Sequence, residues 1–294
     1  MNINIIARND CFACQSKDIE ILKSVPFMSD IVFDFLKLSY GSNVQNLNLK
    51  DKNIAYSYCR NCSMVWQKYI LNDEGLEYLY EKLVSAKSSL DKRENGSYTQ
   101  FESYLEDVKR IKFFYPNNKP RDIKVLDFGM GWGHYCIAAN AVGFNTYGCE
   151  LSEERIKYAK TKGVNIIKNT KEINDNFYDF INVEQVFEHL SNPVEILQEL
   201  SRILKLGGIL KISVPNSIHS IKNLRSGSWK PIKDSLEPLQ HINSFTNQTL
   251  KTFALNNNFT NVTPTYNKGI SFKNFIKEKI KSYFATSLYF KKIH

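Results

Sequence analysis

Hydrophobic and polar positions follow a strand-then-helix pattern in the middle of the chain. Residues 123–128 (IKVLDF) form a short run rich in β-branched and apolar side chains, which predicts a strand. Residues 134–141 (HYCIAANA) have the composition of a helix, and Gly143 is well placed to end it in a left-handed cap. Residues 145–149 predict a second strand. Three glycines separate the first strand from the helix, namely Gly129, Gly131 and Gly133. This order of elements is the first half of a nucleotide-binding βαβ unit.

The glycine turn and the acid after the second strand have the chemistry of a nucleotide-ligand site. Glycine lets the backbone bend sharply and approach a ligand closely, and the free N–H groups at the start of the next helix attract a carboxylate or phosphate. Glu150 follows the second strand, where an acid accepts both hydroxyls of a ribose. The dinucleotide fingerprint has its third glycine one residue later, where this chain has His134. The turn therefore departs from the dinucleotide pattern.

Residues 127–133 (DFGMGWG) instead resemble motif I of the class I S-adenosylmethionine (SAM) methyltransferases. Further stretches resemble later motifs of that family in the same order and spacing, namely residues 150–152, 179–190, 192–210 and 240–246 with Leu250 and Phe259. The last of them is similar to a subgroup that includes many small-molecule and sugar methyltransferases. The resemblance covers roughly residues 123–263, about half of the chain. It implies an α/β fold with a doubly wound, Rossmann-like, seven-stranded methyltransferase sheet.

The resemblance also implies SAM as the cofactor and places it around the glycine turn. Asp127 would hold the methionine ammonium, directly or through water, and Glu150 would take the ribose hydroxyls. The loop with Asn169 and Thr170 should border the adenine, although the acid often found there is missing. The alternative for Asp127 and Glu150 is a role as ordinary strand-end caps. The expected cofactor contacts are Asp127, Gly129, Met130, Gly131, Gly133, Glu150, Leu151, Asn169, Thr170 and Glu184.

Two histidines are candidates for the base that removes a proton from the methyl acceptor. His189 follows the predicted fourth strand, at the carboxyl edge where open α/β sheets bind ligands. His241 lies after the fifth strand, and in similar sugar methyltransferases a histidine of that segment is implicated as a base. A histidine has a pKa near neutrality, which suits this role. A role for His189 in orienting its loop is the alternative.

Four of the six cysteines form two Cys-x-x-Cys pairs, Cys11 with Cys14 and Cys59 with Cys62. Such pairs predict a tetrahedral zinc site, because each pair wraps one side of the ion. Redox pairing is the alternative, but neither pair opens a helix beside a thioredoxin-like pattern. With four cysteine ligands no position stays open for catalysis, so the zinc is expected to be structural. Residues 19–49 between the pairs would form an inserted lobe with a helix over residues 25–38.

Composition divides the chain into four predicted segments. Residues 1–72 form the zinc-ribbon-like module with its inserted lobe, and residues 73–120 a helical linker or cover that Asp73 would cap. Residues 121–264 form the methyltransferase core. Residues 265–294 alternate aromatic and basic side chains at helical spacing, which predicts a basic helical tail that packs on the domain or on a second subunit. A homodimer is therefore one candidate assembly.

A basic stretch between Pro215 and His241 is interpreted as a loop that covers the substrate. It holds the cations Lys222, Arg225, Lys230 and Lys233 together with His219 and one early acid, Asp234. A solvated basic face is the simplest reading of this pattern. A basic lid would also suit an anionic acceptor, such as a phosphorylated or nucleotide-linked sugar.

Length and composition set outer bounds on these interpretations. The chain has 294 residues, 43% of them hydrophobic, which is room for one large domain and a small one. The sequence contains no run of eighteen apolar residues, so no membrane span is expected. Its N-terminus lacks the basic start and long apolar core of a signal peptide. A cytoplasmic protein is therefore expected. The formal charge of +9 is compatible with nucleic acid, with an acidic small substrate, or with neither.

Three functions remain open from the sequence. The favoured one is SAM-dependent methylation of a small polar acceptor, with a sugar, sugar phosphate or nucleotide sugar expected as the acceptor and an oxygen atom preferred as the methylated atom. A sugar C-methyltransferase would carry a further C-terminal domain. An RNA methyltransferase that binds RNA through the cysteine module is the second candidate. Residues 184–187 (EQVF) lack the motif for base amines, so nucleic acid is not expected as a partner. A non-catalytic nucleotide-binding or zinc scaffold is the third.

Overall fold

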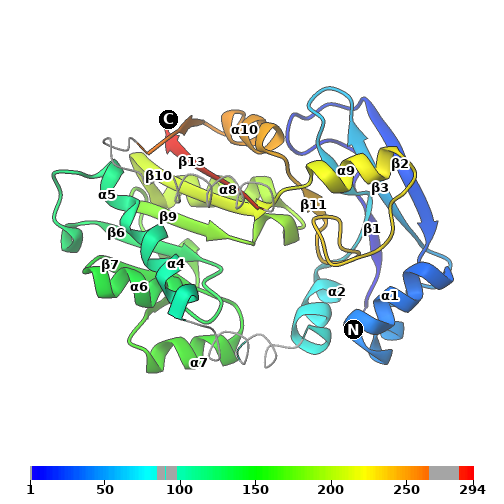
Figure 1. The fold of residues 1–294 in the computed structure, drawn as a ribbon, viewed down its shortest axis with the longest axis horizontal. Helices are drawn as coiled ribbons and strands as arrows, with labels where there is room; N and C mark the ends of the chain where they lie inside the picture. Colours follow the sequence, from blue (N-terminus) through cyan, green and yellow to red (C-terminus); the bar gives the residue numbers. More distant parts are fainter. Residues whose placement is uncertain (1, 85–89, 91–97, 265–284) are drawn as a thin grey trace. The chain divides into compact units, whose positions relative to one another are not determined.

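A computed structural model describes residues 2–84, 90, 98–264 and 285–294 (Figure 1). The chain divides into two compact units, each built from separated stretches of sequence. The N-terminal unit comprises Met1–Ala86, Phe187–Pro193 and Val214–Asn256, and the sheet unit comprises Lys87–Val186, Val194–Ser213 and Asn257–His294.

The sheet unit is built on a seven-stranded sheet with the strand order β12-β13-β10-β9-β6-β7-β8. The strands are β6 (Lys124–Phe128), β7 (Asn145–Cys149), β8 (Asn165–Ile167), β9 (Tyr178–Glu184), β10 (Leu204–Pro215), β12 (Phe259–Val262) and β13 (Ala285–Lys292). Strands β8, β7, β6, β9 and β10 pair in parallel, whereas β12 and β13 pair antiparallel. The apolar runs in β6 and β9 are buried, as expected for parallel strands that are covered on both faces. This arrangement confirms the α/β, Rossmann-like fold expected from the sequence.

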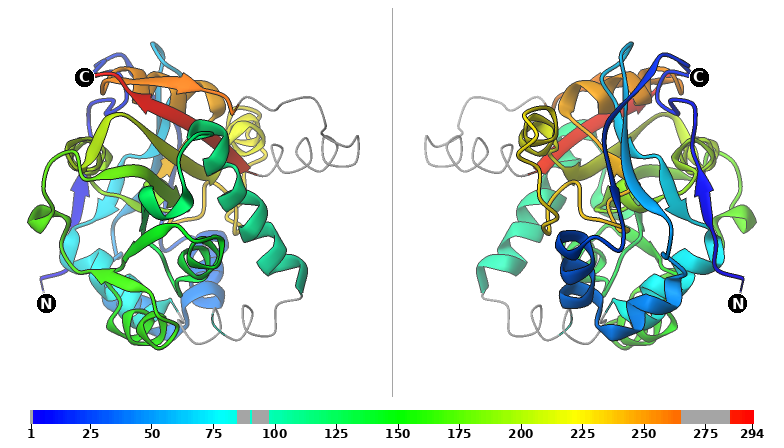
Figure 2. Two further views of the ribbon diagram at one scale, coloured as in Figure 1. Left: turned by 90° about the vertical axis from the view of Figure 1, so that its left-hand side faces the viewer. Right: turned by 90° about the vertical axis from the view of Figure 1, so that its right-hand side faces the viewer.

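Helices cover both sides of this sheet (Figure 2). They are α4 (Tyr98–Lys109), α5 (Ile111–Phe114), α6 (His134–Val142), α7 (Glu153–Thr161) and α8 (Pro193–Ile203), with short 3₁₀ turns η3 (Pro120–Asp122) and η4 (Thr170–Glu172). Val108, Ile111 and Ala138 bury their side chains against Val125 and Phe180 of the sheet, so α4, α5 and α6 share one core cluster. Among the described residues, no helix combines the length and apolar character that crossing a membrane requires.

The N-terminal unit contains a four-stranded antiparallel sheet and a two-stranded one. The larger sheet has the order β11 (Asn243–Ser244), β4 (Val65–Gln67), β3 (Asn53–Cys59) and β2 (Ile19–Pro26), and the smaller pairs β1 (Ile5–Ala7) with β5 (Tyr69–Leu71). Its helical elements are α1 (Asp30–Tyr40), η1 (Ser42–Leu47), α2 (Asp73–Tyr78), a π-helical turn η2 (Leu79–Leu83), η5 (Phe187–His189), α9 (Ile218–Arg225) and α10 (Asn247–Leu255). Strand β11 therefore pairs a late stretch of the chain with β4, the neighbour of the strand β3 that ends at Cys59.

Several local predictions differ from the structure. The inserted lobe holds a strand as well as a helix, because residues 19–26 pair with β3 as β2 and the helix begins at Asp30. Asn72, one residue before Asp73, caps α2 by accepting a hydrogen bond from the Gly75 N–H. The basic stretch expected to be a loop contains helix α9, whose buried residues are Ser220 and Leu224.

The predicted C-terminal tail and segment boundaries also need correction. Residues 265–284 of the predicted helical tail lie outside the described residues, but Ala285–Lys292 form strand β13, which pairs antiparallel with β12. Thr286, Phe290 and Lys292 are buried on one face of β13, and Tyr289 is buried on the other. The seventh strand thus comes from beyond residue 264, whereas residues 214–256 group with the N-terminal unit. The four contiguous segments predicted from composition do not follow this division.

Candidate functional site

Three polar side chains form a row across neighbouring parallel strands of the sheet unit. The register pairs Asp127 of β6 with Asn182 of β9, and Asn182 with Lys211 of β10. Each of the three is at most 3% exposed. Polar side chains at such positions are costly unless they are paired, and side chains at equivalent positions of adjacent strands lie on the same face. The sheet therefore concentrates charge and hydrogen-bonding groups near its carboxyl edge.

Asp127 lies at the centre of this chemistry. Its Oδ1 accepts a hydrogen bond of 2.7 Å from Asn182 Nδ2, and the thiol of Cys136 lies 3.7 Å from Oδ2. Burial raises the pKa of Asp127 to about 7, and the hydrogen bond from Asn182 offsets only part of that effect. Asn182 Oδ1 is buried and has no hydrogen-bond partner among the described residues. Two acceptor groups are thus available here for a cationic ligand.

Lys211 is the buried cation of the row. Its Nζ lies 2.7 Å from Asp107 Oδ2 of α4 and 3.7 Å from Glu184 Oε2 at the end of β9. Burial by itself lowers the pKa of Lys211, but the carboxylates of Asp107 and Glu184 more than offset this, so its pKa is raised and the amine stays protonated. Lys211 lies between the apolar residues Leu210 and Ile212, and a lysine in such a setting is the sequence signal that could have revealed it.

The glycine turn after β6 has the backbone that its sequence predicts. Gly129 and Gly131 have φ of +72° and +57°, which side chains other than glycine rarely adopt. A Cβ on Gly129 would lie 2.4 Å from Val186 Cγ2, so this position excludes a side chain. Around Gly131 there is open space, with nothing within 4 Å of an added Cβ. The backbone of Gly131 is therefore accessible to a ligand.

Glu150 stabilises the glycine turn by accepting hydrogen bonds from backbone N–H groups. Its Oε2 accepts a hydrogen bond of 2.9 Å from the Gly131 N–H, and its Oε1 accepts from the N–H groups of Leu151 and Ser152 at 2.9 and 3.0 Å. Arg155 Nη1 lies 3.6 Å from Oε2. A carboxylate has about four lone-pair positions, so these contacts leave little capacity. Glu150 orders the turn in addition to any role in binding a ribose.

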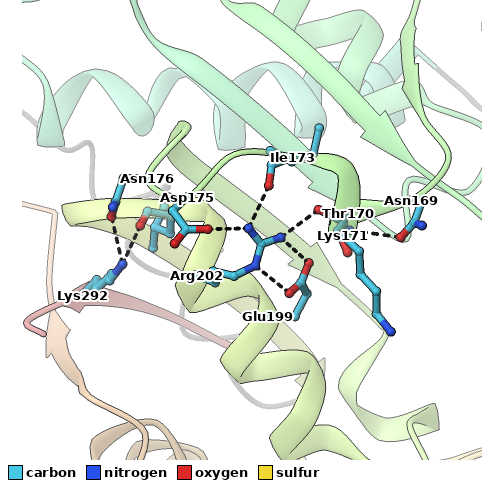
Figure 3. A network of polar contacts seen from close by, with 10 residues as sticks. Asn169, Thr170, Lys171, Ile173, Asp175, Asn176, Glu199, Arg202 and Lys292 are labelled. Atoms are coloured by element: carbon cyan, nitrogen blue, oxygen red, sulfur yellow. Dashed lines mark hydrogen bonds and ion pairs between the residues drawn. The ribbon is translucent and has the colours of Figure 1, made fainter.

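The loop after β8, which is expected to border an adenine, is held from helix α8. Arg202 donates to the backbone carbonyls of Ile173 and Thr170 at 2.8 and 3.0 Å. It also pairs with Asp175 at 2.6 Å and with both carboxylate oxygens of Glu199 at 2.8 and 3.0 Å. Figure 3 shows this guanidinium pointing from α8 into the loop. Arg202 therefore fixes the backbone of the loop that carries Asn169 and Thr170. Arg202 was not identified as a functional residue from the sequence.

The remaining predicted cofactor contacts differ in their surroundings. Met130 buries its side chain with Cys136, Ile156, Ala159 and Val164, so it serves the core while its backbone belongs to the turn. Leu151, by contrast, is 89% exposed directly after Glu150. Gly133 takes the N-cap position of α6 with a left-handed backbone. Asn169 caps η4 by accepting from the Lys171 N–H at 3.0 Å, and the Glu184 side chain is 40% exposed at the end of β9.

The two histidines lie together in the N-terminal unit, with ring centroids 5.0 Å apart. His189 Nδ1 is 3.0 Å from the Gln240 carbonyl oxygen and 3.0 Å from Tyr80 Oη. His241 Nδ1 contacts the Asp234 carbonyl oxygen. A carbonyl only accepts, so each Nδ1 carries a proton and each Nε2 keeps its lone pair. Burial and His241 lower the pKa of His189 to about 3, and burial lowers the pKa of His241.

Asn243 joins the two stretches that carry these histidines. Its Nδ2 donates hydrogen bonds of 2.8 Å to the carbonyls of both Phe187 and Leu190, on either side of His189. Its Oδ1 accepts from Arg8 Nη1 at 2.6 Å. Arg8 also donates to the Ile242 carbonyl at 2.6 Å, next to His241. With buried Glu188, the two histidines offer ligand atoms within 4.8 Å of one another, which is also the composition of a metal site.

The four predicted zinc ligands converge as well. Cys11 and Cys62 have Sγ atoms 3.5 Å apart, as do Cys14 and Cys59, and all four sulfurs lie within 4.8 Å of one another. A tetrahedral zinc with bonds of about 2.3 Å places its sulfurs about 3.8 Å apart. Tight turns shape both halves, since Gln15 N donates to the Cys11 carbonyl at 2.7 Å and Ser63 N to the Cys59 carbonyl at 2.9 Å. The donor set and spacing fit a zinc ion.

Comparison with known families agrees with this geometry. A methyltransferase domain family matches residues 99–263, more than half of the 294-residue chain. The chain belongs to this family. The match confirms the class I methyltransferase resemblance drawn from the sequence, and it includes the glycine turn, Glu150 and both histidines.

Curated relatives of this methyltransferase match only part of their own length. A ubiquinone biosynthesis O-methyltransferase of Rickettsia bellii is 32% identical over 117 residues, 37% of this chain and 48% of that protein. One from Shewanella sp. strain ANA-3 is 27% identical over 103 residues, 32% of this chain and 44% of that protein. An uncharacterized protein of Methanocaldococcus jannaschii is 28% identical over 114 residues, 38% and 51% of the two chains. The methyltransferase thus spans about half the length of the curated relatives it matches.

A solved structure shares the fold of this methyltransferase. The plantazolicin methyltransferase BpumL, solved in complex with SAH, aligns with a TM-score of 0.51 and 17% identity. The alignment covers 74% of this chain and 94% of that one. Identity at this level supports the shared fold, and the site of this methyltransferase rests on its own residues.

Proposed function

We propose that the protein transfers a methyl group from SAM to a small polar acceptor, with an oxygen atom favoured as the acceptor. The observation that carries this proposal is the open backbone of Gly131 between two acids, Asp127 and Glu150, at the carboxyl edge of a methyltransferase sheet. Ligands of open α/β sheets bind at this edge. The residues present fit SAM, which offers an ammonium, a carboxylate and a ribose to such groups.

The chain's own residues would hold the cofactor in distinct ways. Asp127 and the unpartnered Oδ1 of Asn182 would accept hydrogen bonds from the ammonium, because both acceptors are buried side by side. Glu150 would accept the ribose hydroxyls after giving up part of its backbone contacts, and Leu151 would contact the nucleoside. The loop fixed by Arg202 would border the adenine with Asn169 and Thr170. Bound SAM supplies an electrophilic methyl group on a sulfonium.

Removal of the acceptor proton is assigned to His241. Both histidines present a lone pair on Nε2, because each Nδ1–H is committed to a backbone carbonyl. A pKa of about 3 makes His189 a weak base near neutral pH, and burial also lowers the pKa of His241. The similarity of residues 240–246 to sugar methyltransferases favours His241 as the base. His189, held between Tyr80 and Gln240, would then pack against His241 and orient it.

The acceptor is proposed to be a sugar or a phosphorylated or nucleotide-linked sugar. The similarity of residues 240–246 to sugar methyltransferases supports a sugar, and the curated O-methyltransferase relatives support an oxygen acceptor. The four cysteines are proposed to hold a structural Zn²⁺ that shapes the N-terminal unit without joining the chemistry, because a Cys₄ site has no open position. A cytoplasmic location remains the expectation for such an enzyme.

The proposal is tested by methyl transfer and by binding. Tritiated methyl transfer from SAM is measured into a small-molecule extract and into RNA, with the full chain and with Asp127→Asn. Incorporation into the small-molecule fraction that Asp127→Asn abolishes is expected, together with calorimetric binding of S-adenosylhomocysteine (SAH) by the wild-type chain. Incorporation into RNA alone would instead favour an RNA methyltransferase. A chain that binds neither SAM nor SAH would be no methyltransferase at all.

A further inference from the structure

A hollow of about 360 Å³ lies on the N-terminal unit against helix α9. It is lined by Tyr58, Ser63, Ile218, Ile221, Lys222, Arg225 and Thr246. Two of these side chains are cationic, three carry hydroxyl groups and none is acidic. The hollow thus combines positive charge, neutral hydrogen-bonding groups and an apolar wall in one place, and none of these residues belongs to the cofactor or histidine sites described above.

Arg225 is held in place by an aromatic ring. Its guanidinium carbon lies 4.3 Å from the centroid of the Tyr58 ring, a cation–π contact that orients the planar group. Lys222, three residues earlier on α9, lines the same hollow. Neither Arg225 nor Lys222 forms an ion pair with a carboxylate among the described residues. An oriented guanidinium without an acidic partner retains the paired N–H donors that match a phosphate.

The turn from Cys59 to Cys62 positions two residues that line the hollow, Tyr58 and Ser63. Tyr58 precedes Cys59 on β3, and Ser63 follows Cys62, with the Ser63 N–H bonded to the Cys59 carbonyl at 2.9 Å. Ser63 has a left-handed backbone with φ of 66°, and its hydroxyl lies 3.1 Å from Tyr58 Oη. The turn that gathers two cysteine sulfurs therefore also sets the distance between Tyr58 Oη and the Ser63 hydroxyl.

The other residues that line the hollow are apolar, or their polar group already forms a hydrogen bond within the protein. Ile218 is 57% exposed although it faces the hollow, and Ile221 lies one turn further along α9. The Thr246 hydroxyl caps α10 by accepting from the Thr249 N–H at 3.2 Å. Cations in the last turn of a helix stabilise its carbonyl end, but that role requires neither a hollow beside them nor a tyrosine stacked on the guanidinium. The arrangement suits a ligand with one anionic group and one less polar face.

We propose that this hollow binds the phosphate group of the methyl acceptor, which is therefore a phosphate ester or a diphosphate-linked compound. Arg225 donates paired hydrogen bonds to the phosphate, Lys222 adds charge, and Ser63 donates from its hydroxyl. The isoleucines contact the less polar part of the same molecule. Identification of the ligand as the methyl acceptor rests on the proposed methyltransferase function, whereas the phosphate site itself rests on the residues of the hollow alone.

The experiment compares matched ligands on the full-length chain. Uridine diphosphate is titrated against uridine, and glucose 6-phosphate against glucose, by calorimetry at low and at physiological salt. We expect the phosphate-bearing member of at least one pair to bind, to weaken as salt rises, and to outbind its phosphate-free partner at least tenfold. The first pair reports a nucleotide-linked acceptor and the second a sugar phosphate. Equal or absent binding within both pairs would overturn the proposal.

Variants separate a built site from general charge. Arg225→Gln should weaken binding of the phosphate ligand about tenfold and Arg225→Lys should recover part of it, because lysine keeps the charge without the planar fork. Lys37→Gln is the control, since Lys37 is an exposed cation of the same unit that pairs with Asp34 at 3.2 Å. Equal losses in Arg225→Gln and Lys37→Gln would reduce the effect to net charge and reject the site.

SAH binding is measured on every preparation. All variants should bind SAH as the wild type does, which shows that the sheet unit is folded, and should keep the wild-type tryptophan fluorescence of Trp66 and Trp229, which shows that the N-terminal unit is folded. Failure of SAH binding in the wild-type chain would count against the methyltransferase function, whereas failure of phosphate binding with SAH binding intact would count against the hollow alone.

Discussion

The two units of this protein place their polar groups by different physical means. In the sheet unit, strand register alone aligns Asp127, Asn182 and Lys211, because adjacent parallel strands present equivalent positions on one face. In the N-terminal unit, hydrogen bonds from side chains to backbone carbonyls hold the polar groups in place. Asn243, for example, donates to the carbonyls of Phe187 and Leu190 and so fixes the turn that carries His189. A site built on register tolerates loss of one side chain better than a site held by a few long-range hydrogen bonds and a metal. The comparison predicts where each unit fails.

Zinc removal should produce the largest effect, and it should be confined to the N-terminal unit. Structural zinc in small domains contributes on the order of 10 kcal/mol of apparent folding free energy. Cys59→Ser should lower the zinc content and unfold the unit that contains Trp66 and Trp229, which tryptophan fluorescence and elemental analysis report. SAH should still bind to the sheet unit. Unchanged fluorescence and stability in a zinc-free preparation would contradict a structural metal.

Replacement of His241 should separate the two histidines. General base catalysis contributes about 10²- to 10⁴-fold in rate, so His241→Asn should lower kcat by that range while SAH affinity stays the same. His189→Asn should cost less, because the proposed role of His189 is limited to packing against His241 and orienting it. If both variants keep turnover within a few-fold of wild type, neither residue is the base. Activity that depends on added Mn²⁺ would indicate that the histidines and Glu188 bind a metal instead.

Lys211→Met should test the buried ion pair of the sheet unit. Removing one partner of a buried pair costs about 3–5 kcal/mol when the other charge is left uncompensated. Asp107 keeps Arg110 at 3.8 Å, so we expect a loss at the low end of that range. The double variant Lys211→Met with Asp107→Leu should regain much of that loss in denaturant unfolding. Lys205→Met is the control, because Lys205 lies on the same strand as Lys211 and its Nζ pairs with Asp179 at 2.6 Å. The Lys205 side chain is 40% exposed, and exposed ion pairs contribute about 0–1 kcal/mol. Equal stability of the single and double variants would show that Asp107 does not need its partner.

Asp127 should make stability and cofactor affinity depend on pH in opposite directions. Its pKa is raised to about 7, above an unfolded value of about 3.9. The folded chain therefore binds more protons than the unfolded chain between these values, and stability falls as pH rises through about 4 to 7. SAH carries an ammonium that favours the carboxylate, so SAH affinity should rise over the same range, by up to about tenfold per unit. Asp127→Asn should flatten both profiles, and a wild-type affinity that is independent of pH would exclude Asp127 from the ammonium site.

Arg202→Met should have the smallest effect, limited to the adenine side of the cofactor. The loop would lose two carbonyl contacts and two carboxylate partners. We expect about tenfold weaker binding of SAH and of methylthioadenosine, which lacks the amino-acid part, with kcat at saturating SAM retained. Lys205→Met again serves as the control. Weaker binding of SAH with unchanged methylthioadenosine affinity would place the effect of Arg202 away from the adenine.

The sequence predicted the glycine turn and the cysteine pairs because both signals are local. Glycine at positions 129 and 131 marks a backbone with positive φ, and the structure shows it. Strand β7 has the predicted bounds, and Gly143 takes the predicted left-handed cap. The two Cys-x-x-Cys turns each gather their sulfurs over a few residues, so their spacing alone favoured a metal site. The convergence of the two pairs, however, needed the pairing of distant strands.

The same reasoning missed residues whose partners lie far along the chain. Arg8 bonds Asn243, and Lys211 bonds Asp107, across separations that no periodicity records. Strand β13 falls in the segment predicted as a helical tail, and it becomes part of the sheet because β12 and β10 flank it. The lid predicted as a loop contains α9, whose buried residues Ser220 and Leu224 pack within the N-terminal unit.

The sequence by itself determined the fold class, the cofactor-type turn and the candidate zinc ligands, since backbone conformation and ligand spacing are set over short stretches. Only the tertiary structure decided that Asp127 is buried with a raised pKa, that Lys211 pairs with Asp107 and Glu184, and that each histidine commits its Nδ1 to a backbone carbonyl. Those properties depend on burial and on hydrogen bonds between segments that are remote in sequence, and folding alone brings such segments together.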